Sequence, residues 1–207
     1  INSNDQVVYL DSLKRIGTLD NYKYLRVVKE YNLNKDRYDV ADYYKSGKIQ
    51  MRATSTNKDN LKLEGSVVYF FENGNRKKIV NYINNKPSVK EFEWYENGKI
   101  NSEKENVQED QIGTEIIKII QYWDENNIQN IIDGEGEFTE KDENFTTFSK
   151  GSVKNYFKEG TWIGYSPKYK INFTEKFING RLISGKSIDS LGNENYYDKI
   201  VSGFIVR

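Results

Sequence analysis

The stretch Trp94-Tyr95-Glu96-Asn97-Gly98-Lys99-Ile100 contains a pattern that recurs along the chain. Two aromatic residues are followed by two polar residues, a Gly or Asn, another polar residue and usually a large apolar residue. Further copies occupy residues 43–49, 70–76, 122–128 and 156–162, and a weaker copy occupies residues 177–182. Aromatic pairs at one offset from a turn residue indicate an internal repeat, which sets the fold class of the whole chain.

Each copy predicts a β-hairpin. Three copies carry an Asn-Gly pair, at 73–74, 97–98 and 179–180, and Asn-Gly is a strong hairpin signal because a type I′ turn needs positive φ at both central residues. The tight turns are predicted at or beside Gly47, Gly74, Gly98, Asn126, Gly160 and Gly180. Helical patterns are scarce. We therefore predict an all-β chain of antiparallel β-hairpin repeats that form an elongated, twisted meander sheet.

Alternation before each turn predicts the two faces of this sheet. The first aromatic of each pair shares a face with apolar residues such as Val68, Phe92 and Ile120, and we expect that face to form the core. The second aromatics are predicted on the more exposed face, as a possible binding surface: Tyr44, Phe71, Tyr95, Trp123 and Phe157. A ladder of exposed rings can bind an extended peptide, a carbohydrate or stacked bases. The alternative is that these rings pack on one another as cross-strand pairs.

The repeated unit resembles the bacterial variant of the MORN repeat, which is found in YwqK-like antitoxins. The likeness is closest in Gly160-Thr161-Trp162-Ile163-Gly164 and in residues 179–185, and it covers roughly residues 41–197. It implies a twisted antiparallel sheet used for scaffolding or partner binding, without catalytic residues. The spacing of the copies is irregular, and the fourth copy lacks its Gly.

The first 40 residues lack the repeat. We expect one continuous domain, in which residues 1–40 form a β-rich lead-in segment and residues 41–207 form the MORN-like repeat region.

Composition excludes several kinds of function. The chain has 31 Lys and Arg against 31 Asp and Glu, a balance that argues against nucleic acid as a partner. It contains no His and no Cys, which excludes His-based triads, thiol nucleophiles, disulfides and the usual zinc sites. No motif indicates another metal or a cofactor, and no apolar run is long enough to form a transmembrane segment.

Carboxylate pairs are the remaining candidates for chemistry. Glu91 with Glu93, and Glu135 with Glu137, lie two residues apart and so on one face of a strand. Such pairs can serve a glycosidase. Among 31 acidic residues they also arise on ordinary solvated strand faces, where charge discourages edge aggregation, and we favour this interpretation.

Three functions stay open. The first is a non-enzymatic protein-binding or scaffolding module, bacterial and exported to the periplasm or cell surface, whose partner is another protein. The second is a cytoplasmic antitoxin or immunity protein that neutralises a toxin. The third is a carbohydrate-binding or carbohydrate-active protein. Because residue 1 is Ile, we expect the sequence to be a mature or trimmed form.

Overall fold

The computed structural model describes residues 2–108, 115–141, 147–200 and 203–206. These residues form strands, turns and loops, and no helix occurs among them. The 17 strands belong to one open sheet. From β1 to β7 and again from β8 to β17, each strand pairs antiparallel with the next strand along the chain. The prediction of an all-β chain built from consecutive hairpins is confirmed.

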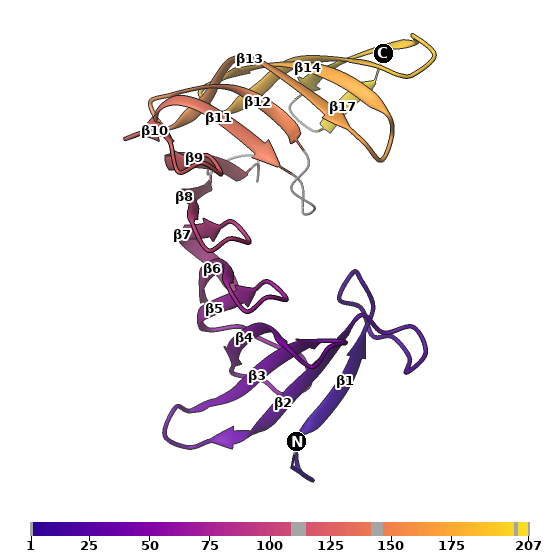
Figure 1. Ribbon diagram of the computed structural model, residues 1–207, viewed down its shortest axis with the longest axis vertical. Helices are drawn as coiled ribbons and strands as arrows, with labels where there is room; N and C mark the ends of the chain where they lie inside the picture. The colour runs from indigo at the N-terminus through magenta and orange to yellow at the C-terminus, as the bar shows by residue number, and fades with distance from the viewer. Residues whose placement is uncertain (1, 109–114, 142–146, 201–202, 207) are drawn as a thin grey trace. The chain divides into compact units, whose positions relative to one another are not determined.

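The chain divides into two compact units, residues 1–101 and 102–207, which we call unit 1 and unit 2 (Figure 1). Unit 1 contains β1 (Gln6–Leu10), β2 (Tyr24–Asn32), β3 (Arg37–Tyr44), β4 (Ile49–Ser55), β5 (Gly65–Phe70), β6 (Arg76–Ile83) and β7 (Lys86–Trp94). Strand β8 (Ile100–Gln108) begins at the end of unit 1. Unit 2 contains β9 (Glu115–Trp123), β10 (Gln129–Ile132), β11 (Glu135–Lys141), β12 (Thr147–Lys154), β13 (Phe157–Ser166), β14 (Ile171–Ile178), β15 (Arg181–Ile188), β16 (Glu194–Ile200) and β17 (Gly203–Val206). The segment predicted as a lead-in holds β1, β2 and the start of β3, which crosses position 40.

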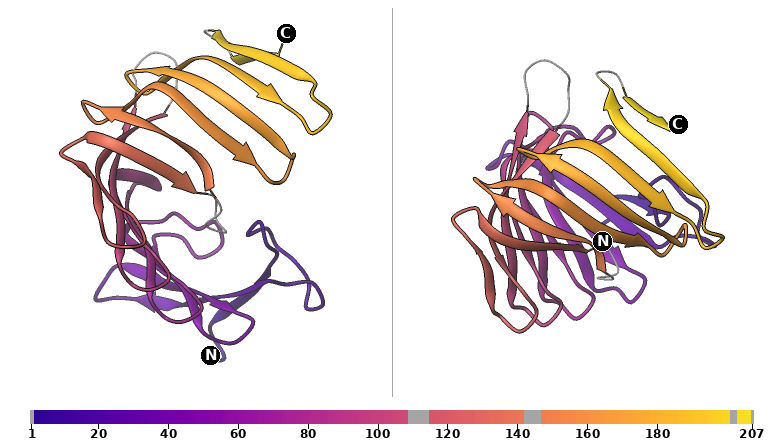
Figure 2. Two further views of the ribbon diagram at one scale, coloured as in Figure 1. Left: turned by 45° about the horizontal axis from the view of Figure 1, so that its top comes forward. Right: turned by 90° about the horizontal axis from the view of Figure 1, so that it is seen from above.

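Each unit has its own apolar cluster on one face of its strands. The cluster of unit 1 consists of Val28, Val40, Met51, Ala53 and Val67. The cluster of unit 2 consists of Ile119, Tyr122, Ile131, Phe138, Val153, Trp162 and Phe177. Residues two apart on a strand point to the same face. The strands of unit 2 run side by side (Figure 2), so every second residue of each strand can contribute to the cluster.

Aromatic rings in unit 2 cover glycines on neighbouring strands. A Cβ added at Gly151 would lie 2.5 Å from the Trp162 ring, and one added at Gly164 would lie 2.2 Å from the Phe173 ring. At Gly185 the same atom would meet the Tyr197 ring at 2.2 Å. The Gly-x-Trp-x-Gly segment thus serves packing, because Trp162 is fully buried and its indole N–H donates to the Ser152 carbonyl at 3.1 Å.

One five-residue loop recurs among the described residues. The N–H of its first residue donates to the carbonyl of the fifth residue, as Tyr44 does to Lys48 at 2.8 Å. The N–H of its fourth residue donates to the carbonyl of the first residue, as Gly47 does to Tyr44 at 2.9 Å. The pattern begins at Asp11, Tyr44, Phe71, Tyr95, Asp124 and Asp189. The fourth residue has positive φ each time: Lys14, Gly47, Gly74, Gly98, Asn127 and Gly192. The turns expected at Gly47, Gly74 and Gly98 are confirmed, but with one left-handed residue these loops are not type I′.

Two-residue turns form the second class. Both central residues have positive φ at 84–85, 133–134, 155–156 and 179–180, as a type I′ turn requires. The turn expected at Gly180 is therefore confirmed. Asn126 lies in a turn too, although its neighbour Asn127 takes the left-handed position. The prediction of a turn at Gly160 is wrong. Gly160 lies inside β13, where the pairing of β12 with β13 shifts its register. The turn of this copy is at 155–156.

The predicted inner and outer faces are wrong in two copies. Phe71 and Tyr95 were expected outside but are only 7% and 3% exposed, whereas Phe70 and Trp94 are half-buried. Val67 belongs to the apolar cluster of unit 1 and Tyr69 packs against it, so Phe71 continues the buried face at every second residue. The face that holds Val68 and Phe70, which was expected to form the core, is half-buried.

The fourth copy follows the expected order, with Tyr122 buried at 4% and Trp123 half-buried. Here the loop begins one residue later, at Asp124 instead of at the second aromatic. The aromatic pair is therefore displaced by one position relative to the loop, and the face of each ring changes with it.

Candidate binding loop

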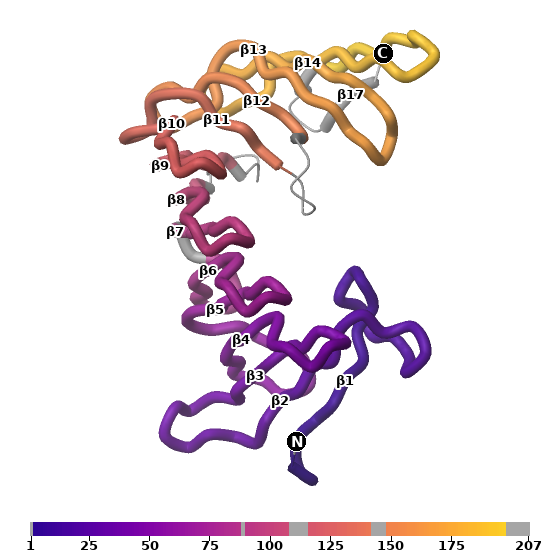
Figure 3. The backbone as a smooth tube through the Cα atoms, in the orientation of Figure 1, coloured from indigo at the N-terminus to yellow at the C-terminus, as the bar shows by residue number. Residues whose placement is uncertain are grey.

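The connection between β1 and β2, residues 11–23, exposes large apolar side chains beside its polar ones. Its three large aliphatic side chains are exposed, Leu13 at 67%, Ile16 at 84% and Leu19 at 64%. Loops ordinarily turn polar side chains toward water, and a group of exposed apolar side chains is typical of an interaction site. We call this segment the apolar loop; Figure 3 traces its backbone in indigo beyond β1.

The first half of the apolar loop is fixed by Asp11. Its carboxylate accepts hydrogen bonds from the backbone N–H of Leu13 at 2.8 Å and of Arg15 at 3.0 Å. The Arg15 guanidinium donates to the same carboxylate at 2.8 Å, and this contact holds the pKa of Asp11 below its usual value. Leu13 is thus presented on a hydrogen-bonded frame.

The second half is fixed by Asn21. Its side-chain oxygen accepts from the N–H and the hydroxyl of Thr18, at 2.9 and 3.0 Å. The backbone joins the strand at two points, where Gly17 N–H donates to the Tyr9 carbonyl at 2.8 Å and Lys23 N–H donates to the Leu10 carbonyl at 2.7 Å. Both halves of the apolar loop are therefore ordered before any partner arrives.

Lys14 carries the backbone strain of this loop. It has φ of 62° at the position that Gly or Asn occupies in the other five-residue loops. For an ordinary L-residue the left-handed conformation costs about 1–2 kcal/mol, and such strain persists only where surrounding contacts enforce it. The contacts made by the Lys14 side chain identify what enforces it here.

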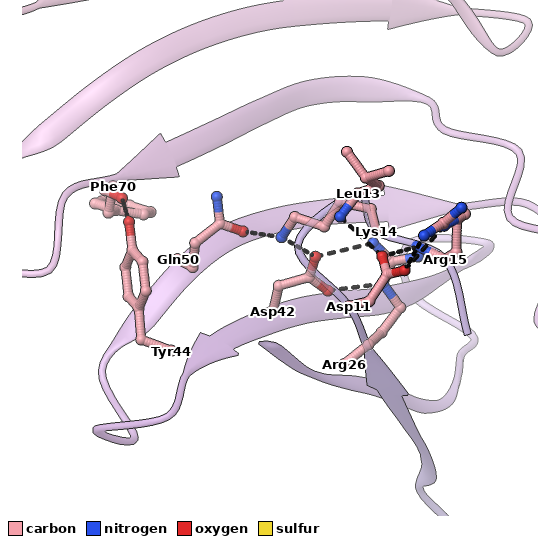
Figure 4. Close-up of polar contacts among 9 residues, drawn as sticks. All are labelled: Asp11, Leu13, Lys14, Arg15, Arg26, Asp42, Tyr44, Gln50 and Phe70. Atoms are coloured by element: carbon pink, nitrogen blue, oxygen red, sulfur yellow. Dashed lines mark hydrogen bonds and ion pairs between the residues drawn. The ribbon is translucent and has the colours of Figure 1, made fainter. Parts of the chain in front are cut away.

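The Lys14 ammonium reaches a buried carboxylate (Figure 4). It lies 3.0 Å from Asp42 Oδ2 and 2.5 Å from Gln50 Oε1, and 3.5 Å above the centre of the Tyr24 ring. Asp42 is 1% exposed and also accepts two hydrogen bonds from Arg26, at 2.7 and 2.9 Å. This bidentate pair and the ammonium surround one buried charge with two cations.

The electrostatics of this cluster follow from its burial. Desolvation lowers the pKa of Lys14 below its usual value, and the attraction of Asp42 opposes that shift. The cluster ties the apolar loop to β2, β3 and β4, because Arg26, Asp42 and Gln50 stand on these strands or at their ends. The Lys14 side chain thus points toward Asp42, while Leu13 points away from the ion pairs (Figure 4).

The aromatic residues proposed as a binding face do not form an exposed row. Tyr44 is half-buried, donates its hydroxyl to the Phe70 carbonyl at 2.7 Å and stands 5.8 Å from the Tyr24 ring. Burial raises its pKa to about 12. Phe71 and Tyr95 are buried, and Trp123 and Phe157 are half-buried.

The carboxylate pairs are engaged in local contacts. Lys78 lies 2.7 Å from Glu91 and 3.7 Å from Glu93, while Glu135 accepts the N–H of Asn155 at 2.8 Å. Across the described part of the chain, no cluster of carboxylates has the composition of a metal site. The same residues include no helix with the length and apolar character needed to cross a membrane.

The Lys14–Asp42–Arg26 cluster was missed by sequence reasoning. Asp42 stands beside the first aromatic pair, where alternation placed it on the half-polar face. Its two cations come from a loop 28 residues away and a strand 16 residues away, and no local spacing links them. The Asp-x-x-Gly-Asn signal at 189–193, by contrast, could have been recognised as a turn.

Comparison with protein-family models and with curated proteins finds no match for this chain. The resemblance to the MORN variant therefore remains an expectation drawn from the repeated residues.

Proposed function

We propose that this chain is a non-enzymatic protein-binding module that contacts its partner through the apolar loop. The observation that carries the proposal is the exposure of Leu13, Ile16 and Leu19 on a segment whose Lys14 is tied inward to Asp42. Removing a large aliphatic side chain from water contributes about 1.5–3 kcal/mol.

Preorganisation supports the same proposal. Ordering a flexible loop on binding costs free energy that a fixed loop has already lost on folding. The hydrogen bonds of Asp11 and Asn21 fix the loop before binding. Less of the free energy gained by burying the three aliphatic side chains is therefore offset by the cost of ordering the loop. Because the contact is led by apolar burial, we expect affinity to depend weakly on ionic strength.

The test compares two triple variants by quantitative affinity capture from the native lysate. Leu13→Ser/Ile16→Ser/Leu19→Ser removes the apolar surface of the loop. The control Leu33→Ser/Ile128→Ser/Leu191→Ser changes residues that are 85%, 58% and 85% exposed elsewhere. We expect a protein that the wild type and the control retain at low and high salt and that the loop variant loses.

The captured protein is then purified and titrated against all three chains by calorimetry. Burial of the loop predicts a negative heat-capacity change for the wild type and the control. If the loop variant binds as tightly as the control, the apolar loop is not the contact.

A further inference from the structure

Unit 2 carries a groove of about 470 Å³ on the strand face that bears Trp162. Side-chain alternation places its lining there: Glu140 follows Phe138 by two residues, and Glu175 precedes Phe177 by two. The volume lies within the roughly 300–1,000 Å³ of small-molecule sites. The groove shares no residue with the apolar loop, so the two can be tested independently.

Aromatic rings line one part of the groove. Phe148 and Phe173 stand 5.4 Å apart, and Tyr169 and Tyr197 contribute two more rings. Phe173 can lie flat against the sheet because Gly164 opposite it has no side chain. Tyr169 is 63% exposed, so it offers its ring to a ligand at the rim.

Hydrogen-bonding groups line the rest. Glu140 accepts from Lys158 Nζ at 2.8 Å and from the Ser149 hydroxyl at 3.1 Å. Glu175 accepts from the Tyr197 hydroxyl at 2.9 Å. A carboxylate has about four acceptor sites, so both keep capacity for hydroxyl groups of a ligand, and Lys158 can donate.

The combination indicates a neutral polyol with apolar ring faces. Lys158 pairs with Glu140, so a phosphate or carboxylate ligand would be repelled mainly by Glu175. A hydrocarbon would desolvate both glutamates without offering hydrogen bonds. An organic cation would be attracted by Glu175 and repelled by Lys158, and choline tests this alternative directly. A sugar ring offers apolar C–H faces to aromatic rings and hydroxyls to carboxylates at its edge. We infer that this groove binds a neutral mono- or disaccharide.

The test is ligand-observed NMR and calorimetry of the full chain with glucose, galactose, mannose, N-acetylglucosamine, maltose and lactose. Choline and gluconate serve as charged probes. We expect at least one neutral sugar to bind with a dissociation constant of about 1 mM or tighter, a range accessible to these methods, and both charged probes to bind at least tenfold more weakly.

Two exposed tyrosines provide a matched pair of variants. Tyr169→Ala removes a ring of the groove, and Tyr165→Ala removes a 40% exposed ring that is not part of its lining. We expect Tyr169→Ala and Glu175→Gln each to weaken sugar binding about tenfold, as loss of one ring contact or one charged acceptor predicts, with Tyr165→Ala unchanged. The inference is overturned if no neutral sugar binds, if choline or gluconate binds as well, or if both tyrosine variants behave alike.

Discussion

A single buried carboxylate, Asp42, connects the stability of unit 1 to the shape of its apolar loop. Its charge is compensated by Arg26 and Lys14. We expect Asp42→Asn to destabilise the chain by about 3–5 kcal/mol, because it leaves two partly buried cations unpaired. Lys14→Met keeps the Arg26 pair, so its cost is smaller, about 1–3 kcal/mol.

Urea unfolding followed by tryptophan fluorescence measures both changes. Lys35→Met is the control, since its pair with Asp39 is largely exposed and exposed pairs contribute little. Equal midpoints for Asp42→Asn and Lys35→Met would show that the cluster does not stabilise the fold.

Buried tyrosine hydroxyls predict a loss of stability at alkaline pH. Burial raises the pKa of Tyr44 and of Tyr69 to about 12 in each case, above the value of about 10 in an unfolded chain. The folded state then retains protons that the unfolded state releases, so this stabilisation is complete below about pH 10 and is lost as the pH rises to about 12. Urea midpoints between pH 9 and 12 should fall less steeply in Tyr44→Phe and Tyr69→Phe, whereas Tyr169→Phe, at a 63% exposed position, should match the wild type.

At the scale of elements, close packing of rings on glycines should make small substitutions costly. Gly164 has ordinary φ, so Gly164→Ala is destabilising only because its Cβ meets the Phe173 ring at 2.2 Å and the Phe148 carbonyl at 2.3 Å. We expect a cost of about 1–3 kcal/mol, typical of overpacking. The double variant Gly164→Ala/Phe173→Leu should cost less than the sum of the single changes, and additive costs in thermal unfolding would exclude this contact as the cause.

The elements themselves were largely predictable, and their faces were not. The Asn-Gly pairs and aromatic repeats located the turns at Gly47, Gly74, Gly98, Asn126 and Gly180, because turn conformation depends on local residues. The turns at 84–85, 133–134 and 155–156 lie outside the repeated pattern or were misplaced by it. The side that Phe71 faces was not predictable because β5 carries apolar residues at both alternate sets of positions, and only the set with Val67 is buried in the cluster. The copy at 156–162 was misplaced because its Tyr156 lies in the turn itself. The Lys14–Asp42 pair was beyond prediction, since it joins distant segments through burial.

At the scale of the molecule, the two units contain separate apolar clusters that share no residue. In repeat proteins stability is transmitted mainly between neighbouring elements, so a cavity in one cluster should loosen the strands around it first. Trp162→Ala, which removes a fully buried ring, should cost about 3–5 kcal/mol and reduce amide protection mainly in β11–β14. Met51→Ala should reduce protection mainly in β3–β5. Hydrogen exchange followed by mass spectrometry distinguishes such local loosening from unfolding of the chain as a single cooperative unit. In a single cooperative unit, both variants would lose protection equally across all described strands.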